Sequence, residues 1–180
     1  MTAAFRRRAG RPTARFSAAE AGVLRQVVAD VVDLLGGPQA GTDDPLAGMG
    51  TEPGSPADPA LARLLPDGYR DDPAAAGELR RLTESSLRAE KVRNAQAVLD
   101  ALPAGGGNVV LAGADAADVW LRALNDVRLA LGTRLQVTEE LDLAAEIEAD
   151  PDSPRSYALA VYDWLGWLQE TLIQAVSAGG

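Results

Sequence analysis

Residues 115–132, with the sequence DAADVWLRALNDVRLALG, give the clearest indication of the fold. Apolar side chains recur there at helical spacing and form one inward face, made of Val119, Trp120, Leu121, Leu124, Val127 and Leu131. Pro154 then opens a second such segment, whose inward face comprises Tyr157, Val161, Trp164, Leu165, Leu168, Leu172 and Val176. Because an apolar helix face has to pack against another element, these two segments predict a mainly helical protein.

Further helix signals precede these two segments. Ser17 and Glu20 form a capping box ahead of an apolar face. Asp58-Pro59 and Asp72-Pro73 each place a capping residue before a proline in the first helical position. The polar residues 83–86 predict a break or kink in the long helix that follows, since Ser and Thr compete for backbone hydrogen bonds. Together the patterns predict about six helices, near 17–35, 58–65, 73–102, 115–132, 139–149 and 153–177.

One segment, Val109-Val110-Leu111, has the composition of a buried strand. A single strand is not stable alone, so it needs a partner, and residues 1–16 are the best candidate because they form a basic arm or a short hairpin. Residues 36–57 are rich in Gly, Pro, Ser, Thr and Asp and predict a mobile surface loop. We therefore expect one domain over residues 1–180, mainly α, with a helical bundle and a small two- or three-stranded antiparallel sheet.

The chain contains neither cysteine nor histidine. Disulfides, thiolate chemistry and Ser-His-Asp catalysis are thereby excluded, and the commonest metal ligand is missing. No apolar run approaches the roughly 20 residues that span a bilayer, and the start does not have the pattern of a signal peptide. The sequence thus predicts a cytoplasmic, non-enzymatic protein with no cofactor and no membrane partner.

Charge is distributed unevenly along the chain. The net charge is −9, yet residues 1–17 contain no acid and five arginines, which are Arg6, Arg7, Arg8, Arg11 and Arg15. The remainder has 12 basic and 26 acidic side chains, a balance of 12 − 26 = −14. Such a body repels phosphate backbones, so nucleic acid could be contacted only by the arm, with Phe5 and Phe16 available for stacking. The same arginines could instead face acidic protein surface.

Two groups of side chains are candidate sites. The first is polar and lies on or near the helix at 115–132: Arg122, Asn125, Asp126 and Arg128, with Lys91 and Asn94 as further members. Arg122 and Asp126 are four residues apart, so they can pair along one face of the helix. We interpret this group mainly as a network that fixes helix packing, and alternatively as the wall of a small-molecule pocket.

The second group is the aromatic segment near the C-terminus, with Trp164, Trp167, Tyr162 and Asp163 as a candidate partner surface. Trp164 belongs to the predicted core face, whereas Trp167 lies at its margin. An exposed Trp beside an apolar stripe is typical of an interface anchor. This surface would suit a protein partner or a homodimer.

Several strings carry a family resemblance: FSAAE (16–20), DPALARLLPDGYRDD (58–72), RRLTE (80–84), KVRN (91–94), WLRALNDVRLALGTRL (120–135) and YDWLGWLQETL (162–172). They resemble an actinobacterial family catalogued as a domain of unknown function, which includes the oxidative stress transcriptional regulator AosR of mycobacteria. The resemblance implies regulation through contact with a sigma factor of the extracytoplasmic-function class, triggered in the mycobacterial member by oxidation of a CxxxC thiol pair. This chain has no cysteine, so that trigger does not transfer.

The leading hypothesis is therefore a transcription-associated stress-response regulator that acts through protein contacts, with a sigma factor or RNA polymerase as its partner. A homodimeric interaction module and a small-molecule-binding domain are the alternatives.

Overall fold

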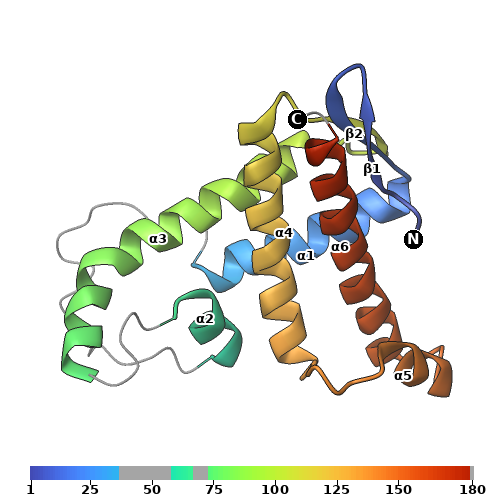
Figure 1. Cartoon of the computed structure of the whole chain (residues 1–180). Helices are drawn as coiled ribbons and strands as arrows, with labels where there is room; N and C mark the ends of the chain where they lie inside the picture. The colour runs from blue at the N-terminus through green and yellow to red at the C-terminus, as the bar shows by residue number, and fades with distance from the viewer. Residues whose placement is uncertain (37–57, 67–72, 179–180) are drawn as a thin grey trace.

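Strands open the chain and helices make up most of the rest, as the computed structural model shows for residues 1–36, 58–66 and 73–178 (Figure 1). The elements in chain order are β1 (Phe5–Arg8), β2 (Arg11–Phe16), α1 (Ala18–Leu34), α2 (Pro59–Leu64), α3 (Pro73–Ala101), β3 (Gly107–Val110), α4 (Ala114–Arg134), α5 (Leu143–Ala149) and α6 (Pro154–Ser177). The expected mainly helical fold with a small antiparallel sheet is confirmed. Beyond Gly36, the predicted loop at 36–57 lies outside the described residues.

The sheet joins the N-terminal hairpin to the isolated strand. Its order is β1-β2-β3 with both pairs antiparallel, and Phe5 lies opposite Ala14 while Arg15 lies opposite Asn108. Ala9 and Gly10, with φ of 46° and 79°, form the two-residue turn between β1 and β2, and two positive φ angles are what such a turn requires. The predicted pairing of the arm with the Val109 segment is confirmed.

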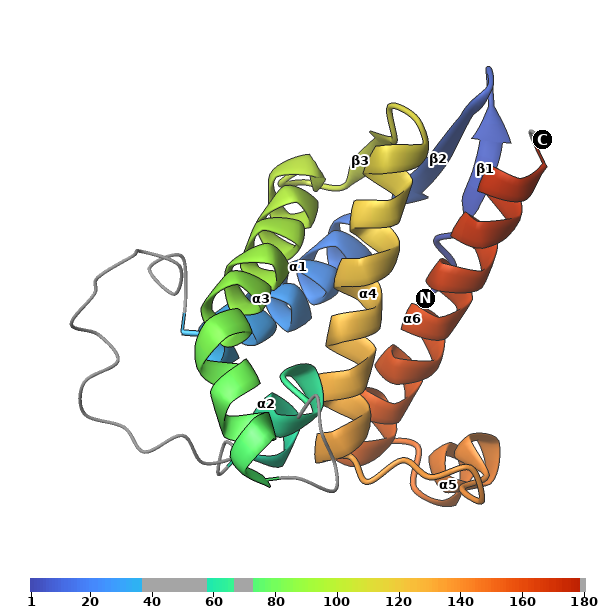
Figure 2. The ribbon, with the colours of Figure 1, turned by 60° about the vertical axis from the view of Figure 1, so that its left-hand side comes forward.

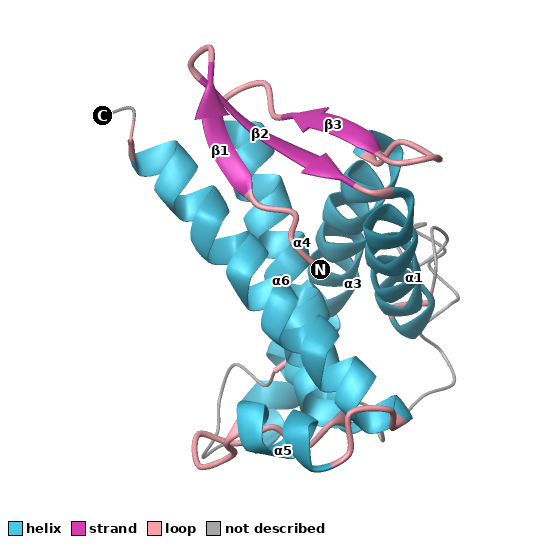
Figure 3. Ribbon diagram, turned by 90° about the vertical axis from the view of Figure 1, so that its right-hand side faces the viewer, coloured by secondary structure: helices cyan, strands magenta, loops and turns pink. Residues whose placement is uncertain are grey.

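The helices form a bundle in which α4 lies between α3 and α6 (Figure 2). The sheet closes one end of this bundle, and α5 lies at the other end (Figure 3). Aromatic rings join the sheet to the helices: Phe5 meets Trp120 at 5.5 Å and Phe16 meets Trp164 at 6.4 Å between ring centroids. All four side chains are buried, so the inner face of the sheet belongs to the hydrophobic core.

Helix boundaries show where sequence patterns were sufficient. The capping box is present, with the Ser17 hydroxyl accepting from the Glu20 N–H. The sequence predicted a break or a kink at 83–86; α3 has no break, and the helix bends in its N-terminal half (Figure 1). The Ser86 hydroxyl donates to the Thr83 carbonyl. α4 ends at Arg134, two residues beyond Gly132, near which the sequence predicted its end. Gly132 gives room to Tyr162, since a Cβ there would lie 2.9 Å from the Tyr162 ring.

Within the described ranges, no helix combines the length and the apolar character needed to cross a membrane.

Candidate functional site

The start of the chain is fixed by one buried carboxylate in the first turn of α1. Glu20 Oε1 accepts hydrogen bonds from the backbone N–H groups of Thr2 at 2.5 Å and Ala3 at 2.9 Å. Glu20 Oε2 accepts from the Ser17 N–H at 2.9 Å and from the Ser17 hydroxyl at 2.8 Å. Burial alone would raise the pKa of Glu20, but these hydrogen bonds to Ser17, Thr2 and Ala3 lower it to about 2. Residues 2–3 are therefore held against α1 by an ionised carboxylate.

Two contacts from α6 complete this attachment. The indole N–H of Trp164 donates to the Ala3 carbonyl at 3.4 Å, and the Phe5 N–H donates to the Thr171 hydroxyl at 3.1 Å. Trp164 is only 4% exposed. It therefore has the core position that its helical spacing indicated, and it contributes little exposed area to the predicted partner surface. We call the segment Thr2–Phe5, held by Glu20, Trp164 and Thr171, the N-terminal tether.

Four of the five arginines lie together on the outer face of the sheet. Alternation along the strands directs Phe5, Ala14 and Phe16 into the core and leaves the arginines that alternate with them exposed. We call this set the arginine face; it comprises Arg6, Arg8, Arg11 and Arg15. No acidic side chain of the described residues forms an ion pair with any of them.

Arg7 is the exception among the five arginines. Strand alternation directs it toward the helices, and its guanidinium donates to the Ala175 carbonyl near the end of α6 at 3.4 Å. A cation at the carbonyl end of a helix is favourable. Arg7 therefore attaches the hairpin to α6 and is not part of the arginine face.

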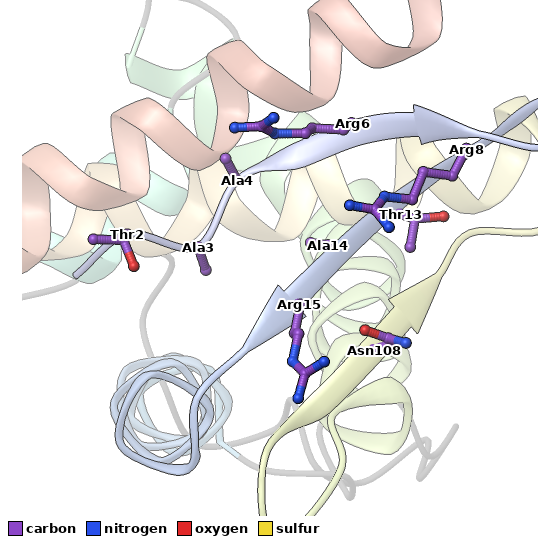
Figure 4. Close-up of a pocket in the computed structure, with 9 residues that line it drawn as sticks. All are labelled: Thr2, Ala3, Ala4, Arg6, Arg8, Thr13, Ala14, Arg15 and Asn108. Carbon is purple, nitrogen blue, oxygen red and sulfur yellow. The ribbon is translucent and has the colours of Figure 1, made fainter.

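A hollow of about 330 Å³ lies on the arginine face where β1 and the N-terminal tether diverge from β2. Arg6, Arg8 and Arg15 stand around it, and Thr13 and Asn108 add polar groups (Figure 4). Ala3, Ala4 and Ala14 also line it. Neither Thr13 nor Asn108 was predicted as a site residue. Thr13 lies opposite Arg6 in the β1–β2 pairing, and the pairing of β2 with β3 places Asn108 opposite Arg15.

A second hollow, of about 380 Å³, lies between the chain start, α5 and α6. We call it the tryptophan hollow; it is lined by Met1, Ile147, Ala160, Asp163, Trp164 and Trp167. Trp167 is 47% exposed and Met1 is 46% exposed, so a large apolar surface faces solvent here. Of the predicted partner surface, Trp167 and Asp163 are exposed as expected. Met1 and Ile147 were not predicted, because nothing in their local sequence indicates that they lie beside α6.

The polar group on α4 proves to be divided between two helix interfaces. Lys91 on α3 donates to the Asp126 carboxylate at 2.6 Å. Burial raises the pKa of Asp126, although the hydrogen bond from Lys91 opposes the rise. The predicted pairing of Arg122 with Asp126 is wrong, since the Arg122 guanidinium donates to Asp118 at 2.8 Å and to Glu90 at 3.2 Å. Lys91 and Asp126 thus form a packing pair between α3 and α4.

Arg128 lies on the opposite side of α4, where α6 packs. Its guanidinium donates to Gln169 Oε1 at 2.9 Å and to the Tyr162 hydroxyl at 3.3 Å, and it lies 4.8 Å from the centre of the Tyr162 ring. Tyr162, which the sequence assigned to the candidate partner surface, is therefore engaged with α4 and does not line the tryptophan hollow.

Asn125 and Asn94 do not belong to either interface network. Asn125 is exposed, and neither Asn125 nor Asn94 has a side-chain hydrogen bond to another residue in the described part of the chain. Neither of the two hollows described above includes any member of the α4 polar group. The packing interpretation thus fits the charged members of the group. The predicted network included two residues too many, Asn94 and Asn125.

In the described part of the chain, no group of three or more acidic side chains is arranged to hold a metal ion. What the arrangement offers chemically is recognition at two surfaces: an apolar hollow with an exposed indole, and an array of guanidinium groups that bind carboxylates or phosphates.

The charged groups between the helices are paired, whereas the arginine face and Trp167 are exposed. The fold and these groups define a mainly helical protein whose candidate binding groups lie on its surface. The chain belongs to the DUF2017 family, a domain of unknown function, whose model matches residues 1–176. It is 40% identical over 136 residues to the putative oxidative stress regulator AosR of Mycobacterium leprae, which covers 68% of this chain and 60% of the relative. It is 37% identical over 131 residues to the oxidative stress regulator AosR of Mycobacterium tuberculosis, covering 66% of this chain and 58% of the relative.

The family membership indicated by the sequence strings is thus confirmed, and the family includes proteins named as regulators. The matched region spans about 60% of the length of these relatives. No solved structure matches the chain.

Proposed function

We propose that this chain is a non-enzymatic regulator of transcription that acts by contacting a component of the transcription machinery, a sigma factor or RNA polymerase. The names of its relatives support a regulatory role. The missing histidine and cysteine support the non-enzymatic part, since the usual bases and nucleophiles are not available. Because there is no cysteine, the trigger cannot be oxidation of a thiol in this chain.

One observation carries the protein-contact part of this proposal, namely the exposed indole of Trp167 at the edge of the tryptophan hollow. Trp is enriched among the residues that contribute most to protein interfaces, because it buries a large rigid area. The neighbouring Met1 and Ile147 extend the apolar surface, and Asp163 supplies a charged rim. This combination of an apolar centre and a polar edge is the usual anatomy of a contact surface.

The test is affinity capture of the tagged chain from a lysate of its native host, with proteins identified by mass spectrometry. We expect RNA polymerase subunits or a sigma factor to be enriched on the wild type and to be depleted at least about tenfold on Trp167→Ala, the loss typical of an interface anchor. Tyr157→Ala is the matched control, since Tyr157 is an aromatic residue of the same helix with 57% exposure and does not line the hollow.

Capture of no transcription component by the wild type would refute the transcriptional role. Equal capture by the wild type and Trp167→Ala would refute the tryptophan hollow as the contact site. Light scattering of the two proteins addresses the homodimer alternative, because a dimer that Trp167→Ala abolishes would assign this surface to a second copy of the chain.

A further inference from the structure

The arginine face differs in charge from the rest of the molecule. Residues 1–17 carry five arginines and no acid, whereas residues 18–180 have a balance of −14. Arg8 lies directly opposite Arg11 in the β1–β2 register. Like charges in directly opposite positions destabilise a sheet, and no ion pair with a described acid offsets this cost. An arrangement that the fold itself does not favour is expected to serve an anionic ligand.

The positions of the side chains favour a ligand with several separate negative charges. Arg6 and Arg8 are two residues apart on β1, which places their Cα atoms about 6.8 Å apart in an antiparallel strand. Arg15 reaches the hollow from β2, on its other side (Figure 4). Acidic residues two positions apart on an extended segment have the same spacing, about 6.8 Å between their Cα atoms. Acidic residues three or four positions apart on a helix lie about 5–6 Å from each other.

Two observations argue against nucleic acid as that ligand. Phe5 and Phe16, the aromatic residues of the hairpin, are 3% and 1% exposed and pack in the core, so the stacking suggested by the sequence is not available. A phosphate backbone that continues beyond the hollow would also run across a body with a balance of −14. A short acidic segment meets the arginines without this extended repulsion.

We infer that the arginine face is a docking surface for a carboxylate-rich segment of a protein partner, with Arg6, Arg8 and Arg15 as the principal contacts and Thr13 and Asn108 as neutral hydrogen-bonding groups beside them. This inference rests on the proposed function, because it supplies a second contact for the same kind of partner. The hollow on the arginine face shares no lining residue with the tryptophan hollow, and the consecutive residues Thr2 and Met1 line the first and the second, respectively.

The experiment measures binding of a fluorescent oligo-glutamate peptide to the purified full chain by anisotropy, at low and at physiological ionic strength. We expect binding that weakens with salt and that falls about tenfold in the triple variant Arg6→Gln, Arg8→Gln, Arg15→Gln, since each exposed charge pair contributes modestly. The control is Arg63→Gln, Arg93→Gln, Arg134→Gln, which removes equal charge from exposed positions elsewhere. Circular dichroism establishes that both variants fold, and Arg6→Lys, Arg8→Lys, Arg15→Lys is expected to restore most of the binding.

Three results would overturn the inference: absence of peptide binding, an equal loss in both glutamine variants, or tighter binding of a single-stranded oligothymidylate of equal charge, which would assign the face to nucleic acid. Salt-sensitive self-association that the Arg6, Arg8, Arg15 variant abolishes would assign it to a second copy and would also overturn it. Trp167→Ala is expected to leave peptide binding unchanged. Loss of peptide binding with intact Trp167-dependent capture would therefore reject only the docking surface, and the reverse result would reject only the proposed function.

Discussion

Two buried carboxyl groups lie at different places in this fold, and their pKa values are shifted in opposite directions. Glu20, at the sheet end, accepts four hydrogen bonds from backbone N–H groups and a hydroxyl. Asp126, between α3 and α4, accepts one from the Lys91 ammonium. Burial raises the pKa of both, yet the pKa of Glu20 is lowered to about 2 while that of Asp126 remains raised. At Glu20 the hydrogen bonds together outweigh burial, whereas at Asp126 burial, with a smaller contribution from the charge of Glu90, outweighs the Lys91 ammonium.

The difference separates two structural tasks. Glu20 holds a chain segment that has few other attachments, and the position of the N-terminal tether shapes the hollow on the arginine face. Lys91 and Asp126 join two helices that already pack through apolar side chains. Glu20 should therefore contribute more to the stability of the fold than the Lys91–Asp126 ion pair does.

The largest effect is expected for Glu20→Gln. An amide cannot accept hydrogen bonds at both ends, so two donors among Thr2, Ala3 and Ser17 lose their partner. The lowered pKa corresponds to about 3 kcal/mol of stability at pH 7, at 1.36 kcal/mol per pKa unit. We expect the free energy of unfolding in urea to fall by about that amount, with Asp33→Asn, an exposed change on the same helix, within about 0.5 kcal/mol of the wild type.

The same carboxylate predicts a dependence on pH. Because the folded-state pKa of Glu20 lies below its unfolded value of 4.5, its contribution is complete above pH 4.5 and is lost as the pH falls toward 2. The stability difference between the wild type and Glu20→Gln should therefore shrink over this range. A difference that stays constant would show that Glu20 stabilises the tether by packing and not by charge.

A smaller effect, about 2 kcal/mol at pH 7, is expected for Lys91→Met. Removing one partner of a buried pair leaves an uncompensated charge, but Asp126 can take up a proton because its pKa is already raised. The sign of the pH dependence is opposite to that of Glu20: lowering the pH through the raised folded-state pKa relieves the cost, so the variant should recover stability relative to the wild type in acid. Urea unfolding at two pH values measures this.

The double variant Lys91→Met, Asp126→Leu is the control, since it replaces both charges by apolar groups. It should be more stable than Lys91→Met alone. A double variant as unstable as Lys91→Met would mean that the pair, like the bonds to Glu20, is needed for the geometry of the interface.

The sequence predicted those parts of this comparison that depend on local spacing. The Ser17–Glu20 capping box follows from residues three apart, and the helical faces follow from their period. The further bonds of Glu20 to Thr2 and Ala3 span 18 and 17 residues, and no local pattern encodes them. Likewise Lys91 was assigned to the right network but Asp126 was given the wrong partner, because Arg122 satisfies the four-residue rule while the side chain turns toward Asp118 and Glu90. Sequence spacing identifies faces, whereas tertiary packing selects partners.

The smallest effect is expected at the α4–α6 interface. Its geometry depends on a glycine, and not on a buried carboxylate as at Glu20 and Asp126. A methyl group at Gly132 would lie 2.9 Å from the Tyr162 ring, whose hydroxyl and face contact Arg128. Gly132→Ala must displace that ring, which costs free energy because the interface is overpacked. The better helix propensity of alanine offsets part of this cost, so we expect the free energy of unfolding to fall by about 1 kcal/mol. Gly22→Ala in α1 is the matched control, since nothing lies within 4 Å of the added atom, and it should gain about 0.5–1 kcal/mol. If both variants gained stability equally, the Tyr162–Arg128 contact would yield without cost, and the interface would depend on apolar packing alone.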